Sequence, residues 1–328
     1  MSGVLVWIDQ FKGRALPISW EAIAAGRSLA ERLGGPLSAV VFGQGIDAVA
    51  AEAFQYGADR VIKSDDATLA DFRLEPYAAL LDKVIAGENP SVVIAGASTR
   101  GRELVAASAA DAGAPLLDDV TEIVVDGSTY RAVHPVYAGK VLSDVSAATD
   151  DLHFVTARNR AFTAPEPQPA RSGEVIRVTP VLSEDQIATK VVRFEETGRG
   201  TVNLSDARII VSGGRGVGGP DGFAPIRDLA VALGGAVGAS RVAVDNGWIP
   251  YAHQVGQTGK TVSPDLYIAV GISGSVQHQA GMRTSKVIVA VNKDAEAPIV
   301  KLARYAVIGD LFTLLPALTG AVKARLGK

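Results

Sequence analysis

The sequence predicts a protein of two α/β domains, each built on a mainly parallel, doubly wound sheet, with a Rossmann-like second domain. Two observations carry this prediction. The chain of 328 residues is long enough for two domains. In both halves, short and nearly continuous apolar runs alternate with longer helical patterns, as in βαβ units whose strands are buried on both faces. Apolar residues make up 48% of the chain, which is enough to fill two buried cores.

The first part of the chain supplies consecutive strand–helix pairs. Glycines stand where helices should end, at Gly34, Gly35 and Gly113, because glycine readily adopts the left-handed backbone of a helix C-terminus. The expected strands span residues 4–8, 37–42, 60–62 and 92–95, and the expected helices span residues 20–33, 46–56, 76–86 and 102–112.

After residue 119 the apolar runs become shorter and more alternating. Turn signals at Asp126-Gly127 and Ala138-Gly139 join some of them, as in hairpins. We therefore expect antiparallel strands that extend the first sheet, over residues 120–125, 129–137, 140–147 and 153–157. The proline-rich residues 163–173 should be extended. Strand character returns at residues 175–181 and 191–194.

The best domain boundary is the segment 195–203, which contains Gly198 and Gly200. It divides the chain into an N-terminal α/β domain, residues 1–199, and a C-terminal domain, residues 200–328. The alternation of strands and helices resumes after this segment. The expected strands span residues 207–211, 266–270, 286–291 and 306–308, and the expected helices span residues 222–233 and 310–326.

Composition excludes several classes of function. The formal net charge of -3 provides no basic field for nucleic acid or an anionic membrane. The chain has no cysteine, so disulfides, thiolate nucleophiles and Cys-ligated metals are excluded. The histidines lack metal-ligand spacing, so we expect no metal site. No apolar stretch is long enough for membrane insertion, and the run 4–8 is too short for a signal peptide; we expect a cytoplasmic protein.

The segment 265–292 carries the strongest functional signal. A buried strand runs into Gly271-Ile272-Ser273-Gly274, and a helix should begin at about Ser275. A glycine turn between a strand and a helix can aim unpaired backbone N–H groups at a phosphate. The alternative is a plain turn in which glycine only permits the tight backbone. His278 lies in the first turn of this helix, where we expect a neutral ring because a helix N-terminus disfavours the imidazolium.

Two other segments imitate nucleotide motifs. Gly214, Gly216 and Gly219 satisfy G-x-G-x-x-G, which leaves an NAD-dependent oxidoreductase as a rival hypothesis. No convincing acidic residue stands about twenty residues further on, as that motif requires. Gly259-Lys260-Thr261 imitates the end of a P-loop, but the first glycine of that motif would fall on Gln254, so ATP hydrolysis is rejected.

The segment 265–292 resembles the signature of electron-transfer flavoprotein alpha subunits. The resemblance rests on Leu266-Tyr267, Gly271-Ile272-Ser273-Gly274, Gln277-His278, Gly281 and Ala290-Val291-Asn292. Further family motifs stand at residues 212–216, 237–241 and 254–260, and residues 95–98 and 135–140 resemble the family's first domain. The resemblance covers essentially the whole chain and is densest after residue 205.

The resemblance implies one noncovalent FAD in the C-terminal domain. Arg241 and His278 are the candidates to stabilise negative charge near N1 and O2 of the flavin, and the Thr258 hydroxyl is the candidate near N5. The alternative to a flavin role is a solvated surface position for Arg241, a helix cap for His278 and a turn position for Thr258. The residues that the resemblance assigns to FAD are Arg215, Ser240, Arg241, Val255, Gly256, Gln257, Thr258, Ser273, Gly274, Ser275, Val276, Gln277, His278, Asn292, Asp310 and Leu311.

The resemblance also implies a heterodimer with an electron-transfer flavoprotein beta subunit. AMP or a second FAD is expected only in that subunit, and the N-terminal domain should be structural and form part of the interface. Electrons would come from flavoprotein dehydrogenases, such as the acyl-CoA dehydrogenases of fatty acid β-oxidation, and pass to a quinone oxidoreductase or another acceptor. The chain would be a redox carrier without substrate turnover of its own. A nonredox nucleotide-binding module is the second rival.

Overall fold

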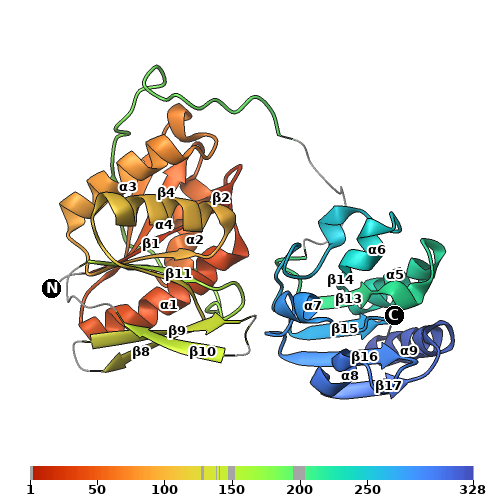
Figure 1. Ribbon diagram of the computed structural model, residues 1–328. Helices are drawn as coiled ribbons and strands as arrows, with labels where there is room; N and C mark the ends of the chain where they lie inside the picture. Colours follow the sequence, from red (N-terminus) through yellow and green to blue (C-terminus); the bar gives the residue numbers. More distant parts are fainter. Residues whose placement is uncertain are drawn as a thin grey trace. The chain divides into compact units, whose positions relative to one another are not determined.

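The computed structural model describes residues 3–126, 129–137, 139, 141–146, 152–194 and 204–327. The chain forms two compact units (Figure 1). The first contains the residues up to Phe194 apart from Val136–Val141, and the second contains the rest. The segment 195–203, which we expected to be the boundary, and the turn residues Gly127 and Ala138 lie outside the described residues.

A seven-stranded sheet forms the centre of the first unit, in the order β12-β5-β4-β1-β6-β11-β7. Each of its neighbouring strands pairs in parallel. Its strands are β1 (Val4–Trp7), β4 (Leu37–Gly43), β5 (Arg60–Asp65), β6 (Val92–Gly96), β7 (Leu116–Val120), β11 (His153–Ala157) and β12 (Glu174–Arg177).

Helices cover both faces of this sheet. They are α1 (Pro17–Leu33), α2 (Asp47–Gln55), α3 (Leu74–Glu88) and α4 (Thr99–Asp111). Alternate residues of β1 point to opposite faces, as the pleat of a strand requires. Val4 and Val6 belong to the core beneath α1 and α2, whereas Leu5 and Trp7 belong to the core beneath α3 and α4. The predicted doubly wound parallel sheet is therefore confirmed.

The antiparallel extension that we expected after residue 119 is wrong in two respects. The strands β8 (Glu122–Asp126), β9 (Thr129–Val136) and β10 (Val141–Ser146) form a separate three-stranded sheet. β11 instead lies inside the main sheet, parallel to β6 and β7. Its polar residues His153 and Thr156 are buried, and the Thr156 hydroxyl accepts a hydrogen bond from the Asp119 amide at 2.7 Å. In the sequence, a buried polar residue whose partner lies far along the chain thus resembles a solvent-facing one.

The strand expected at residues 191–194 is absent, and side-chain contacts hold Phe194 and the residues before this segment within the first unit. Arg73 bonds Glu184 at 2.8 Å, and the Thr189 hydroxyl donates to Glu75 at 2.8 Å. Phe194 then meets Phe11 edge to face. The short strands β2 (Gln10–Phe11) and β3 (Arg14–Ala15) form a hairpin in the first unit.

A five-stranded parallel sheet forms the second unit, in the order β14-β13-β15-β16-β17. The strands are β13 (Ile209–Gly213), β14 (Ala236–Ala239), β15 (Leu266–Val270), β16 (Val287–Asn292) and β17 (Tyr305–Ile308). The helices are α5 (Ala224–Leu233), α6 (Arg241–Asp245), α7 (Val276–Ala280), α8 (Pro298–Leu302) and α9 (Leu311–Leu326).

The connections of the second sheet place its ligand-binding edge. After β13, the chain adds β14 on one side and β15 on the other, so the crossovers diverge between β13 and β15. Open parallel sheets bind ligands beyond the carboxyl ends of the strands at such a switch point. The turns that follow β13 and β15 are thus the place to look for a site. None of the described helices has the length and apolarity to cross a bilayer.

Candidate functional site

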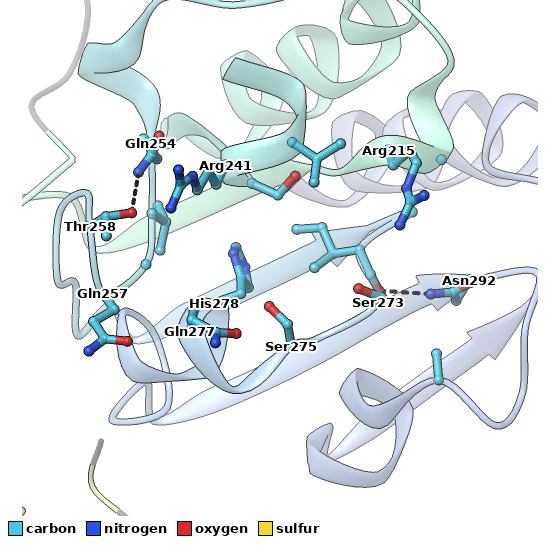
Figure 2. A pocket seen from close by; sticks show the side chains of 18 of the residues that line it. Arg215, Arg241, Gln254, Gln257, Thr258, Ser273, Ser275, Gln277, His278 and Asn292 are labelled. Atoms are coloured by element: carbon cyan, nitrogen blue, oxygen red, sulfur yellow. Dashed lines mark hydrogen bonds between the residues drawn. The ribbon is translucent and has the colours of Figure 1, made fainter. Parts of the chain in front are cut away.

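A cavity of about 520 Å³ lies at the carboxyl ends of the strands in the second unit. Figure 2 shows polar side chains from the turns after β13 and β15, from α6 and from α7 converging on it. The structure brings together most of the residues that the sequence predicted for one site. Those that line the cavity are Arg215, Ser240, Arg241, Val255, Gly256, Gln257, Thr258, Ser273, Ser275, Gln277, His278 and Asn292.

Four predicted site residues are not among its lining residues. Gly274 has a φ of +78°, and a Cβ there would lie 2.5 Å from the Ile299 amide nitrogen, so its role is to let the turn pack on α8. Val276 is half exposed on α7. Asp310 caps α9 by accepting from the Phe312 amide at 2.8 Å. Leu311 is buried and borders a smaller cavity of about 90 Å³ that shares Gly216, Gly271 and Asn292 with the main one.

Some lining residues were not predicted. Those that stand inside the recognised motifs are Gly216, Gln254, Gly271 and Ile272, so the motifs could have indicated them. Val242, Asp294 and Ala297 also line the cavity. Asp294 and Ala297 belong to the segment 292–299, which also resembles the family, so that resemblance could have indicated them, whereas Val242 stands next to Arg241 outside the recognised motifs.

The glycines of the G-x-G-x-x-G sequence bring two turns into contact. The Gly216 amide donates to the Gly271 carbonyl at 2.9 Å. A Cβ on Gly216 would lie 2.7 Å from the Gly271 Cα, and a Cβ on Gly214 would lie 2.4 Å from the Gly271 carbonyl oxygen. Gly219 has open space around it. Packing between the turns after β13 and β15 therefore explains Gly214 and Gly216 without an NAD fingerprint.

The loop that contains Gln254–Lys260 forms the next wall and is fastened to α7. The Gln257 amide donates to the Gln277 carbonyl at 2.8 Å, and the Val262 amide donates to the Gly281 carbonyl at 2.8 Å. Within the loop, the Lys260 amide donates to the Gln254 carbonyl at 2.8 Å. The Gly259-Lys260-Thr261 sequence thus belongs to a tight turn rather than to a strand–P-loop–helix unit.

Anion-binding groups gather on one side of the cavity. Among the described residues, the amides of Ser273, Gly274 and Ser275 donate to no backbone or side-chain acceptor. Gly271 and Gly274 have left-handed φ values of 59° and 78°, a geometry that turns successive N–H groups toward an anion. The helix α7 has only 5 residues, so its dipole is weak and the loop amides matter more than the helix end we expected.

Positive charges outnumber negative ones among the residues that line the cavity. Arg215 and Arg241 supply two guanidinium groups, and Asp294 supplies one carboxylate. Arg241 also pairs with Asp245 at 3.2 Å, but its side chain remains 65% exposed. Arginines and free amides together favour a ligand that carries phosphate.

Asn292 and Thr258 use their polar atoms within the protein. The Asn292 side-chain amide donates to the Ile272 carbonyl at 2.8 Å, and its oxygen accepts from the Asp294 amide at 3.0 Å. Asn292 therefore ties the turn after β15 to the turn after β16. The Thr258 hydroxyl accepts from the Gln254 side-chain amide at 3.0 Å, which leaves its own proton available (Figure 2).

His278 is the buried titratable group of the cavity. Its exposed fraction is 5%, and its Nε2 lies 3.0 Å from the Tyr267 hydroxyl. Burial lowers the pKa of His278 to about 4, and the nearby Val255 backbone offsets only part of this effect, so the ring is neutral near pH 7. The neutral ring agrees with the sequence prediction. Its principal cause is desolvation rather than the helix N-terminus.

We expect the neutral His278 ring to make the second unit acid-sensitive. Its folded-state pKa lies below the unfolded value of about 6.5, so between these values only the unfolded chain binds the proton. The part of the unfolding free energy that depends on a neutral His278 is fully present above about pH 6.5 and is lost as the pH falls toward about 4. Urea unfolding at about pH 7 and pH 5 should show a smaller loss of unfolding free energy for His278→Gln than for the native chain. An equal loss in both would contradict this assignment.

The fold and the cavity together define a class: an α/β protein with a site for an anionic, nucleotide-sized ligand at the switch point of a parallel sheet. Comparison with protein families is more specific. Residues 4–183 match the electron transfer flavoprotein domain, and residues 203–283 match the electron transfer flavoprotein FAD-binding domain. The chain belongs to the electron transfer flavoprotein alpha-subunit family.

Curated relatives match over nearly the full length of the chain. The electron transfer flavoprotein subunit alpha of Bacillus subtilis is 42% identical, over 95% of this chain and 94% of that protein. Protein FixB of Azotobacter vinelandii is 40% identical, over 99% of this chain and 92% of its own length. The electron transfer flavoprotein subunit alpha of Megasphaera elsdenii is 38% identical, over 99% and 97%.

Proposed function

We propose that this chain is the FAD-carrying subunit of a heterodimeric electron carrier, with one FAD held noncovalently in the cavity of the second unit. The observation that carries the proposal is a set of unsatisfied polar groups around that cavity. Within the described residues, the Ser240 hydroxyl and the Nδ1 atom of His278 are buried without a hydrogen-bond partner. The loop amides of residues 273–275 are also unengaged. Buried polar groups of this kind need a partner, and a dinucleotide offers many acceptors.

Different parts of the cavity suit different parts of FAD. Ser273, Gly274 and Ser275, with Val276 at the start of α7, would hold the pyrophosphate through amides and hydroxyls. Arg215 would add a charge-assisted hydrogen bond there. The smaller cavity beside Leu311 would extend the site toward the adenosine, and we place Asp310 and Asn292 at that end.

The opposite end of the cavity suits the flavin ring. Arg241 and His278 would face its N1 and O2 edge, Thr258 would reach N5, and the loop residues Val255 to Gln257, with Gln277 and Ser240, would complete the wall. FAD, when bound, takes up and releases electrons one at a time. The chain's part is to orient the ring and to offer a cation and hydrogen-bond donors where negative charge accumulates.

The proposal includes partners and a cellular role. An electron-transfer flavoprotein beta subunit would complete the pocket and hold any AMP or second FAD. Residues 1–199 would be structural and contribute to that interface, and residues 200–328 would bind FAD. The carrier would act in the cytoplasm without substrate turnover of its own. It would accept electrons from flavoprotein dehydrogenases, such as acyl-CoA dehydrogenases in fatty acid β-oxidation, and deliver them to a quinone oxidoreductase or another acceptor.

Co-expression with a beta-type subunit tests the proposal. The purified complex should be yellow, show flavin absorption bands and release one FAD per chain on denaturation. A colourless complex that refuses added FAD would overturn it. Dehydrogenase activity of the chain alone with a nicotinamide cofactor would favour the NAD alternative, and nucleotide binding without visible absorption would favour a nonredox module.

A further inference from the structure

His278 reaches the cavity with one ring nitrogen engaged and the other unused. In Figure 2 the ring rises from α7 into the space that Arg241 and Ser275 also border. Its Nε2 lies 3.0 Å from the Tyr267 hydroxyl. Its Nδ1 is buried and forms no hydrogen bond in the described part of the chain. The ligand is therefore the natural partner of Nδ1, because a buried polar atom is costly when it stays unsatisfied.

From this geometry we infer that Tyr267 is a positioning residue, which holds His278 in the form that carries its proton on Nδ1 and so makes the ring a hydrogen-bond donor to the cavity. A neutral imidazole has a single N–H group. The hydrogen bond made by one ring nitrogen decides which nitrogen holds that proton. Tyr267 bonds Nε2, and Nε2 is then the acceptor.

Tyr267 is suited to be the donor in this pair. It lies on β15 with no exposed surface, and its ring is tilted by 58° to that of His278. Burial raises the pKa of the phenol, which therefore keeps its proton. A phenol is a strong donor and a neutral imidazole nitrogen is a strong acceptor. In this pair, therefore, the Tyr267 hydroxyl donates its proton in a hydrogen bond to Nε2 and remains bonded to it.

The position of α7 fixes the backbone of His278, but it does not decide which ring nitrogen carries the proton. The hydrogen bond from Gln257 to Gln277 and the close approach of Gly281 to Gly256 hold the helix against the loop. These contacts are made by the backbone and act equally on both forms of the ring. The choice between the two forms is left to the polar groups beside the ring, which are the Tyr267 hydroxyl at Nε2 and the Val255 backbone, whose hydrogen bonding raises the pKa of His278.

The consequence for FAD rests on the proposed function, whereas the protonation state of the ring does not. The N1 and O2 edge of a flavin presents acceptors. A His278 ring protonated on Nδ1 would donate to that edge, but a ring protonated on Nε2 would direct a lone pair at it. Tyr267 would thus influence FAD affinity and the potential for the first electron without touching FAD.

The test compares Tyr267→Phe with the native chain, each in complex with the beta subunit. The chain has four histidines, so ¹⁵N-histidine labelling gives few ring signals, and His278→Gln identifies the signal of His278. We expect long-range ¹H–¹⁵N spectra of the native chain to show the Nδ1–H form at His278. In Tyr267→Phe the ring should move toward the Nε2–H form. FAD binding should weaken by about three- to tenfold, which corresponds to one hydrogen bond.

Tyr77→Phe is the matched control, because Tyr77 is another buried tyrosine whose hydroxyl donates a hydrogen bond, to the Leu69 carbonyl at 2.8 Å in the first unit. It should leave the His278 signal and FAD binding unchanged. An Nε2–H form in the native chain, or a His278 signal that Tyr267→Phe does not move, would overturn the inference while leaving FAD binding intact. Absence of any FAD binding would instead count against the proposed function.

Discussion

Replacing Gly281 with alanine is expected to open the cavity and to destabilise the second unit by about 3 kcal/mol. A Cβ on Gly281 would lie 2.3 Å from the Gly256 nitrogen and 2.5 Å from its Cα. Both are backbone atoms, so no rotamer change relieves the clash, and the loop must move away from α7. The hydrogen bond from Gln257 to Gln277 would stretch with it. Calorimetry should show a lower melting temperature, and a flavin titration should show roughly tenfold weaker FAD binding.

Gly219→Ala provides the control for Gly281→Ala. Gly219 follows the turn after β13 and is not among the positive-φ glycines, and a Cβ added there would have no neighbour within 4 Å. The substitution should change the free energy of unfolding by less than about 0.5 kcal/mol and leave FAD affinity as it is. Equal effects of the two substitutions would show that contact between the loop and α7 does not shape the cavity.

The fold could be predicted wherever burial and sequence pattern agree. β1 and β4 are apolar on both faces and were placed correctly. The prediction failed at β11, where Thr156 and His153 are polar but buried, so a central parallel strand looked like a hairpin strand. It also missed β14, whose sequence Ala-Val-Gly-Ala is too short and too small to show a pattern. In each case the deciding contact comes from residues distant in sequence.

The site could be predicted where the backbone requires glycine at several positions of one short segment. The turn at Gly271–Gly274 is recognisable because its left-handed backbone demands glycine at both ends. Asp294 and Ala297 were not assigned to the site, because a family resemblance over residues 292–299 does not say which of these side chains face the cavity. The use of Asn292 as a tie between two turns was likewise invisible, since its partner Ile272 is brought close by sheet pairing.

The two arginines of the cavity differ from His278 in what they contribute. His278 is neutral, so it can orient a ligand and donate a hydrogen bond but brings no net positive charge to meet a new negative one. Arg241 can meet that charge, because its guanidinium carries a positive charge. Its partner Asp245 is 60% exposed and is separated from it by one helical turn, so water screens this pair and leaves part of the positive field for the cavity.

Replacing Arg241 with alanine is therefore expected to lower the potential at which bound FAD accepts its first electron. Solvent exposure weakens the electrostatic effect of the Arg241 charge on the flavin ring. We therefore expect its loss to change the equilibrium constant for one-electron reduction of FAD by roughly tenfold, or about 59 mV. Arg241→Lys keeps the charge and should recover most of the potential. Reductive titration against a reference dye measures the shift.

Arg208→Ala is the matched control for charge. Arg208 is also an exposed arginine paired with an aspartate, Asp265, at 2.8 Å, but it precedes β13 and so stands at the opposite end of the sheet from the cavity. Removing it changes the net charge by the same amount at a distance where salt screens the effect. Because salt screens the charge at this distance, the potential for the first electron should stay within a few mV of the native value. If Arg208→Ala and Arg241→Ala shift the potential equally, the effect is one of overall charge, and Arg241 does not act at the ring.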